Sequence, residues 1–292
     1  MAHYVPKMKV GEVTMRFRFL LCLYVAAAAA LCAATNPNEL VRSSVAKIEA
    51  DWKAAPRYSY HERDVNEKLD SDGEVSSKTI NTYQVILLDG SEYRKLIAHA
   101  NKPLSSEELA QQEQKLNAEG DRRRHESSSD RAKRVSLYEK ERQQNQRMLL
   151  ELVDAFNFRL RGRQTIDGRK TWVLDATPKP GYVPKTRETK VLVGMRGRMW
   201  IDEQENQWVK VQAKVIKPVS FVFGFASVSP GTEFILEQAP IAGTPDLWLP
   251  THFEEKVNAN ILWFHHKTSL DQTYTNYRLA QPGNPQVADK HP

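Results

Sequence analysis

The sequence predicts an α+β protein built on one strongly curved antiparallel sheet, with helices packed over one side of it. Three observations lead to this class. Short runs rich in β-branched and aromatic residues follow one another through most of the chain, Asp-Gly turns join two pairs of them, and two stretches repeat apolar residues at helical spacing. The runs amount to roughly ten or eleven strands. No repeat of fixed period is visible, which argues against solenoids and propellers.

The N-terminal end has the features of a secretory signal peptide. An apolar run rich in Leu and Ala extends from Phe19 to Leu31, and small residues follow it up to Ala34. Four basic residues precede the run: Lys7, Lys9, Arg16 and Arg18. We expect residues 1–34 to be removed after Ala34, and the mature protein to be periplasmic or secreted. Met1 and Met15 both remain open as the start of this signal.

Both cysteines, Cys22 and Cys32, lie within the expected signal peptide. The mature protein is then expected to have no disulfide and no thiol chemistry, so packing must stabilise it. Leucine precedes each cysteine, which disfavours lipidation there. The net charge of +6 is a mild excess that argues neither for nor against nucleic acid. Secretion argues against nucleic acid as a partner.

Residues 35–280 are expected to form one domain, followed by a disordered polar tail at 281–292. The domain begins with an amphipathic helix from Asn38 to Trp52, which ends before Pro56. A strand at 58–68 follows it. The clearest hairpin pairs 78–88 with 91–100 across Asp89-Gly90, a dipeptide that readily adopts the positive backbone angles of a tight turn.

A charged helical insertion is expected at about 105–156. Ser105 with the acidic residues after it is typical of a helix start. The segment is rich in Gln, Glu, Lys and Arg, and apolar residues form a buried stripe only near its end. We interpret it as a helical hairpin with a mobile, solvated tip around Gly120 to Asp130. Its arginines are interspersed with carboxylates, so a solvated helix is favoured over a membrane-binding surface.

A second hairpin is expected to join 157–167 to 170–177 across Asp167-Gly168. Short strands at 199–202, 208–217, 220–228, 232–237, 247–250, 251–265 and 272–279 complete the chain. The strand at 208–217 alternates polar residues with apolar ones, and alternate side chains of a strand share a face. Its expected buried face consists of Val209, Val211, Ala213 and Val215.

The sequence has no Gly-rich phosphate loop, no Gly-x-Ser-x-Gly elbow and no His-Glu-x-x-His motif. We therefore expect no enzyme, no cofactor and no catalytic residue. His252, His265 and His266 with two nearby glutamates are the one ligand-like group, but adjacent strand residues point to opposite faces. Surface histidines are favoured over a metal site.

Aromatic and aliphatic residues at alternating positions form the candidate ligand-binding set. They are Trp200, Phe221, Phe223, Phe225, Phe234, Trp248, Ile261 and Trp263. One interpretation is an ordinary filled core. The other is that a strongly curved sheet leaves an apolar cavity on its concave face, which a lipid or acyl chain can occupy.

The order of elements resembles that of the periplasmic open half-barrels of the LolA, LolB and RseB type, the outer-membrane lipoprotein-sorting superfamily. The matching features are the signal peptide, the helix at 38–52, the Asp89-Gly90 hairpin, the inserted helices, and Gly197 to Asp202 leading into the next strand. The resemblance implies a half-barrel around an N-terminal helix, with a concave apolar face that receives acyl chains. It implies no catalysis.

Two functions follow as hypotheses. The first is a periplasmic binding protein that holds a lipid, an acyl chain or a lipoprotein segment in the concavity, in lipoprotein or lipid trafficking. The alternative is a structural or sensory envelope protein that binds another protein through the same sheet. A hydrolase with an unrecognised site is the least favoured class. In each case membrane contact is peripheral at most, and nucleic acid is not a partner.

The signal peptide makes the first testable prediction. Because a basic segment, an apolar run and a small-residue site occur in that order, the exported protein should begin at Thr35. The intact mass of the secreted form measures this directly. Retention of residues before Ala26, or a lipid attached to either cysteine, would contradict it.

Overall fold

The computed structural model describes residues 36–221, 226–262 and 264–280. The described residues from Pro37 onwards belong to one compact unit. Its helices are α2 (Pro37–Ala54), α3 (Ser106–His125) and α4 (Ser128–Ala155), with short 3₁₀ turns η1 (Ala55–Arg57) and η2 (Glu188–Gly194). Among these residues, no helix is both long and apolar enough to cross a membrane.

The described residues form one sheet of thirteen strands. The strands are β1 (Tyr58–Leu69), β2 (Val75–Leu88), β3 (Ser91–His99), β4 (Lys102–Pro103), β5 (Phe156–Ile166), β6 (Arg169–Pro178), β7 (Met195–Asp202), β8 (Trp208–Val215), β9 (Val219–Phe221), β10 (Ala226–Val228), β11 (Glu233–Ile241), β12 (Thr244–Ile261) and β13 (Phe264–Leu279). The expected count was lower because β4 is very short and the expected strand at 220–228 is two strands. The expected strands at 247–250 and 251–265 meet in the continuous β12, but β12 ends at Ile261, and His265 already belongs to β13.

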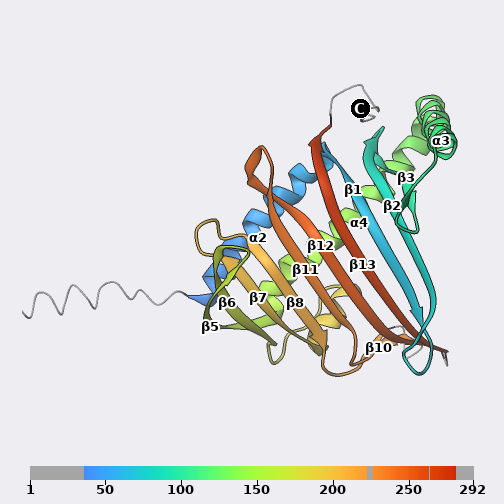
Figure 1. The fold of residues 1–292 in the computed structure, drawn as a ribbon. Helices are drawn as coiled ribbons and strands as arrows, with labels where there is room; N and C mark the ends of the chain where they lie inside the picture. Colours follow the sequence, from blue (N-terminus) through green and yellow to red (C-terminus); the bar gives the residue numbers. More distant parts are fainter. Residues whose placement is uncertain (1–35, 222–225, 263, 281–292) are drawn as a thin grey trace, which may run out of the picture. The chain divides into compact units, whose positions relative to one another are not determined.

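The strand order is β4-β3-β2-β1-β13-β12-β11-β8-β7-β6-β5, with β9 and β10 added beside β12 (Figure 1). All pairs are antiparallel. The order ends at β4 and β5, so the sheet is open. This confirms the predicted α+β class with a large open antiparallel sheet. Asp89-Gly90 and Asp167-Gly168 have the positive φ angles that their tight turns require.

Helices α2 and α4 cross the same face of the sheet (Figure 1), which we call the inner face; the opposite one is the outer face. The N-terminal helix is confirmed, and its apolar stripe is buried. It packs in one cluster with side chains of β5 to β8, among them Leu174, Met199 and Ile201. This cluster is the main hydrophobic core.

Helix α4 contacts β3 near one edge of the sheet and β5 at the other, and it contacts α2 and η2 between them. A helix of 28 residues is about 42 Å long at the usual rise per residue. Its last turns carry Leu149, Leu152 and Val153, which pack against the main core. Helix α4 therefore spans the inner face, whereas α3 contacts the sheet at β3, near one edge (Figure 1).

The tip of the helical hairpin differs from the expectation at Arg123. Ser105 and Glu108 form the capping box of α3, and Ser127 caps α4. Arg123, in the segment expected to be mobile, is only 6% exposed and donates hydrogen bonds to the carbonyl oxygens of Leu88 (2.6 Å) and Ser91 (3.0 Å). Most of the segment is exposed to solvent as expected, including residues 127–130, but Arg123 anchors it because its guanidinium group satisfies carbonyl oxygens at the β2–β3 turn.

The buried face of β8 also differs from the expected one, in a single residue, Val209. Val211, Ala213 and Val215 belong to the main core, but Val209 packs with Trp200 in a second cluster. The register between β7 and β8 shifts between Trp200 and Ile201, which pair with Lys210 and Trp208. This bulge leaves Val209 without a cross-strand partner and turns it away from the other valines.

Arg123→Ala tests the anchoring of the hairpin. Because it leaves buried carbonyl groups without a donor, it should lower the free energy of unfolding by about 2 to 3 kcal/mol and make the Glu126-Ser127 turn sensitive to limited proteolysis. Arg124→Ala is the matched control, since that side chain is 57% exposed and its ion pair is with Asp121 of the same helix. Equal cleavage of the two variants would contradict the anchor.

Candidate binding site on the inner face

The inner face has two halves of different chemistry. Over β5 to β8 it is apolar and filled, because the stripe of α2 packs into it. Two buried polar contacts fix the helix there. The Trp208 indole donates to Ser44 Oγ (2.8 Å), and the Gln207 amide donates to Asp51 Oδ2 (2.6 Å). Burial raises the pKa of Asp51 to about 6, although the hydrogen bond from Gln207 opposes the shift.

Over β1, β2, β3 and β13 the inner face carries a group that we call the tyrosine–carboxylate cluster. The Tyr60 ring lies 5.9 Å from that of Tyr274 and 5.3 Å from that of Tyr277. Gln272 donates to Asp64 Oδ1 (3.0 Å) and accepts from the Tyr274 hydroxyl (2.9 Å). The full cluster consists of Tyr60, Glu62, Asp64, Tyr83, Arg94, Gln272, Tyr274 and Tyr277.

Arg94 is the cation at the centre of this cluster. Its guanidinium group pairs with Glu62 and, at 2.5 Å, with Asp64, and it lies 4.1 Å from the centre of the Tyr83 ring. The two carboxylate side chains are 10% and 7% exposed, whereas the Arg94 side chain is 42% exposed. The cluster therefore presents a positive group to solvent above two buried carboxylates.

The surroundings alter the acidity of the cluster. Burial and the nearby charge of Asp64 raise the pKa of Glu62 to about 7, although Arg94 opposes the shift. Burial also raises the pKa of the Tyr60, Tyr274 and Tyr277 hydroxyls. The Tyr274 hydroxyl donates to Gln272, and the Tyr277 hydroxyl donates to the Pro250 carbonyl oxygen (2.7 Å), so these two donors are already used within the protein.

Between the two halves lie apolar side chains that the helices do not bury fully. Phe234 packs against the main core, so it faces inward, and in register it is opposite Glu255, which is opposite Leu270. Leu270 is two residues from Gln272 and shares its face. The inward-facing and half-buried apolar residues of β11 to β13 are Phe234, Leu236, Phe253, Val257 and Leu270. They connect the filled core to the polar cluster.

The structure separates the aromatic residues that the sequence placed together. Trp200 and Trp248 are 7% and 1% exposed and form the second cluster with Val173 and Val209, apart from the main core. Phe234 is on the inner face. The others occur near one end of the sheet: Phe221 is half-buried in β9, and Ile261 is half-exposed at the end of β12. Phe223, Phe225 and Trp263 lie outside the described residues.

The tyrosine–carboxylate cluster was missed in the sequence, although a local signal for it exists. Tyr60, Glu62 and Asp64 alternate along β1 and therefore share a face. A charged face suggests exposure to solvent, so only the pairing of β1 with β2 and β13 places these residues inward.

One of the histidines that the sequence suggested as a possible metal ligand is paired with carboxylates. His252 lies between Glu237 (3.7 Å) and Asp271 (3.3 Å). In the part of the chain that the structure describes, no three metal-ligating side chains come together.

No family model and no curated protein matches the chain. Solved structures do. A DUF1329 family protein from Desulfovibrio piger is 13% identical, with a TM-score of 0.32, over 84% of this chain and 94% of its own. A domain described as an outer membrane lipoprotein-sorting protein, from Vibrio parahaemolyticus, is 11% identical, with a TM-score of 0.32, over 84% and 95%. A LolA superfamily protein from Nitrosomonas europaea is 10% identical, with a TM-score of 0.29, over 80% and 93%. The names of the second and third structures belong to the superfamily that the sequence resembles.

Glu62→Gln tests the electrostatics of the cluster. A carboxyl whose pKa is raised on folding favours the folded state when protonated, so its contribution to stability is present at low pH and is lost as pH rises from about 4.5 to about 7. The variant should be more stable than the wild type at pH 8 by about 1 to 3 kcal/mol, and the difference should shrink towards pH 5. Urea unfolding at both pH values measures this.

Glu67→Gln is the control, because Glu67 lies on the same strand and pairs with Lys78. Asp51 titrates in an overlapping range but is unchanged in all three proteins. A difference between wild type and Glu62→Gln that does not change with pH would show that the Glu62 carboxyl does not titrate in this range.

Proposed function

We propose that the protein is a non-catalytic periplasmic binding protein that holds a lipid, an acyl chain or a lipoprotein segment against its inner face. One observation carries the proposal. The apolar side chains that β11, β12 and β13 present inward stay half-buried, although α2 and α4 cross the same face. Apolar side chains that remain accessible to solvent in this way are typical of a ligand-binding or protein-binding surface.

The chemistry of the face fits an amphipathic ligand. An acyl chain would lie on Phe234, Phe253 and Leu270, beside the Glu255 carboxyl, which lies between Phe234 and Leu270 in register and whose pKa is raised by burial. The polar end would lie near the guanidinium group of Arg94 and the neutral Tyr60 hydroxyl. The pathway served by such binding would be outer-membrane lipoprotein or lipid trafficking.

We propose a smaller set of residues for ligand contact than the sequence suggested. Trp200 and Trp248 are buried in the second cluster, so a ligand on the inner face would not reach them. Phe234 remains a candidate, and the half-buried Phe221 together with the half-exposed Ile261 would extend the surface at one end of the sheet.

Binding of a fluorescent fatty acid to the purified mature protein tests the proposal. Leu270→Lys places an ammonium group on the inner face, where it must be desolvated by a bound acyl chain. It should weaken binding at least tenfold, which corresponds to about 1.4 kcal/mol. Ser269→Lys is the matched control, because the neighbouring residue of β13 points to the outer face.

Three outcomes are informative. Loss of binding in Leu270→Lys alone, with a lipid found by native mass spectrometry of the wild type, supports the proposal. No uptake by the wild type, with no lipid copurified, overturns it. If an envelope protein is captured instead and Leu270→Lys abolishes that capture, the same face serves a structural or sensory protein, which is the alternative function.

A further inference from the structure

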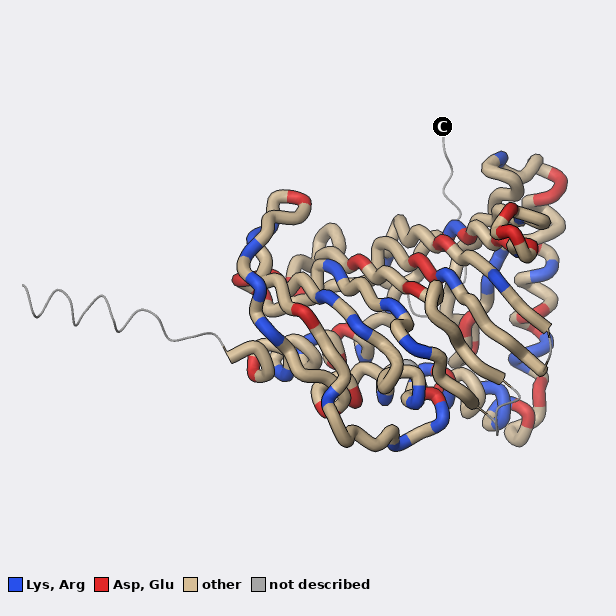
Figure 2. Tube along the Cα trace, turned by 90° about the horizontal axis from the view of Figure 1, so that it is seen from below, with Lys and Arg blue, Asp and Glu red and all other residues tan. Residues whose placement is uncertain are grey.

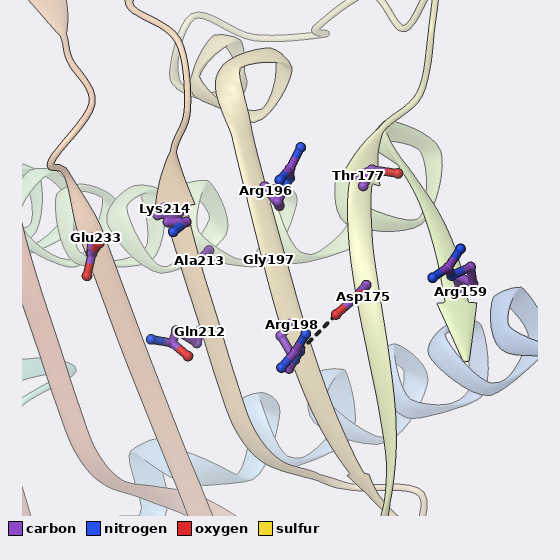
Figure 3. A pocket seen from close by; sticks show the side chains of 10 residues that line it. All are labelled: Arg159, Asp175, Thr177, Arg196, Gly197, Arg198, Gln212, Ala213, Lys214 and Glu233. Carbon is purple, nitrogen blue, oxygen red and sulfur yellow. Dashed lines mark hydrogen bonds and ion pairs between the residues drawn. The ribbon is translucent and has the colours of Figure 1, made fainter. Parts of the chain in front are cut away.

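The outer face of the sheet carries a hollow of about 590 Å³ over β5, β6, β7, β8 and β11 (Figure 3). Its side chains point away from the helices, which lie behind the sheet in this view. The inward-facing neighbours on the same strands, such as Met199, belong to the main core. The charged residues that line the hollow are Arg159, Arg196, Arg198, Lys214, Asp175 and Glu233.

Cations outnumber carboxylates in this hollow, and the carboxylates do not neutralise them. Asp175 is already shared, because Arg198 Nε lies 2.8 Å from one of its oxygens and Arg161 Nε lies 3.1 Å from the other. Among the described residues, no carboxylate lies within ion-pair distance of Arg196 or Lys214. Glu233 is opposite Lys214 in register, yet no ion pair joins them.

The register places two of these cations face to face. Arg196 of β7 is the direct cross-strand partner of Lys214 of β8. Like charges directly opposite each other in an antiparallel pair are destabilising. Charges of both signs are spread along the strands (Figure 2), and the sheet has a second like-charge pair of opposite sign, Glu254 opposite Asp271. An anion placed between the two side chains would turn the repulsion into two attractive contacts.

We propose that this hollow binds a phosphate group carried by a small molecule or by a lipid headgroup. Guanidinium groups match the geometry of phosphate oxygens, and Arg196, Arg198 and Arg159 surround the hollow while Lys214 adds a point charge. The Thr177 hydroxyl and the Gln212 amide line the same space and offer further donors. The volume lies in the range of pockets that hold small organic ligands, which favours an organic phosphate over a single small ion.

The site is independent of the proposed function, since it lies on the opposite face of the sheet from the acyl-binding surface. A failure to bind fatty acid would not count against the phosphate site, and a failure to bind phosphate would not count against the proposed function of the inner face. Binding of a phosphate here would also reduce the charge repulsion within the β7–β8 pair, so ligand and stability should be linked.

Calorimetric titration with inorganic pyrophosphate and cosedimentation with phosphatidylglycerol vesicles test the two sources of phosphate, with phosphatidylcholine vesicles as the neutral control. The variant is Arg196→Gln combined with Lys214→Gln. It should bind at least tenfold more weakly than the wild type, and pyrophosphate or the vesicles should raise the thermal midpoint of the wild type more than that of the variant. Lys210→Gln is the control, because Lys210 is on the same strand and is paired with Glu237 at 2.7 Å.

Binding of pyrophosphate without vesicle binding identifies a soluble phosphate, and vesicle binding without pyrophosphate binding identifies a lipid headgroup; both support the site. No binding of either probe by the wild type overturns it. An equal loss of binding in Lys210→Gln also overturns it, because the interaction would then depend on total charge rather than on this hollow. A circular dichroism spectrum equal to that of the wild type shows that the double variant is folded.

Discussion

The seating of α2 on β5 to β8 is the contact on which the rest of the structure depends. Its apolar stripe fills the main core, and the indole of Trp208 and the amide of Gln207 fix its rotation by donating to Ser44 and Asp51. An amphipathic helix has one apolar face only, so it can fill only part of a broad sheet. Because α2 packs on β5 to β8 and its end packs against Leu247 and Leu249 of β12, the inward faces of β1 and β13 must be covered by other side chains.

The tyrosine–carboxylate cluster covers the inward faces of β1 and β13. It differs chemically from the main core and is less favourable for stability. Glu62 and Asp64 are buried beside one arginine, and the raised pKa of Glu62 means that its ionised form opposes folding near neutral pH. A filled hydrophobic layer would avoid this cost. Proteins commonly keep such unfavourable groups where function needs them, which is the reason to look for ligand contact at the inner face rather than in the main core.

Local patterns in the sequence predicted the helices, turns and strands well. They failed where the pairing with a neighbouring strand determines which face a side chain points to or which residue lies opposite it. The Asp-Gly turns, the capping box at Ser105 and the stripe of α2 are properties of a few neighbouring residues, and all occur in the structure. Val209 was assigned to the wrong face because a single bulge in β8 reverses the alternation there, whereas Trp200 faces outward in regular alternation with the core residues Met199 and Ile201. The pairing of Arg196 with Lys214 could not be predicted from the sequence, because it depends on the register of two strands.

Alternation explains how one set of strands can carry two unrelated surfaces. Along β7, Met195 and Met199 enter the main core, whereas Arg196 and Arg198 point to the outer hollow. Gly197 lies between the two arginines, and a Cβ atom there would meet the Gln212 carbonyl oxygen at 3.1 Å and the Ala213 Cβ at 3.5 Å. The close approach of β7 to β8 therefore sets the packing beneath the sheet and the spacing of the cations above it. A change at Gly197 would disturb both surfaces, while changes at Arg196 or Lys214 affect only the outer one.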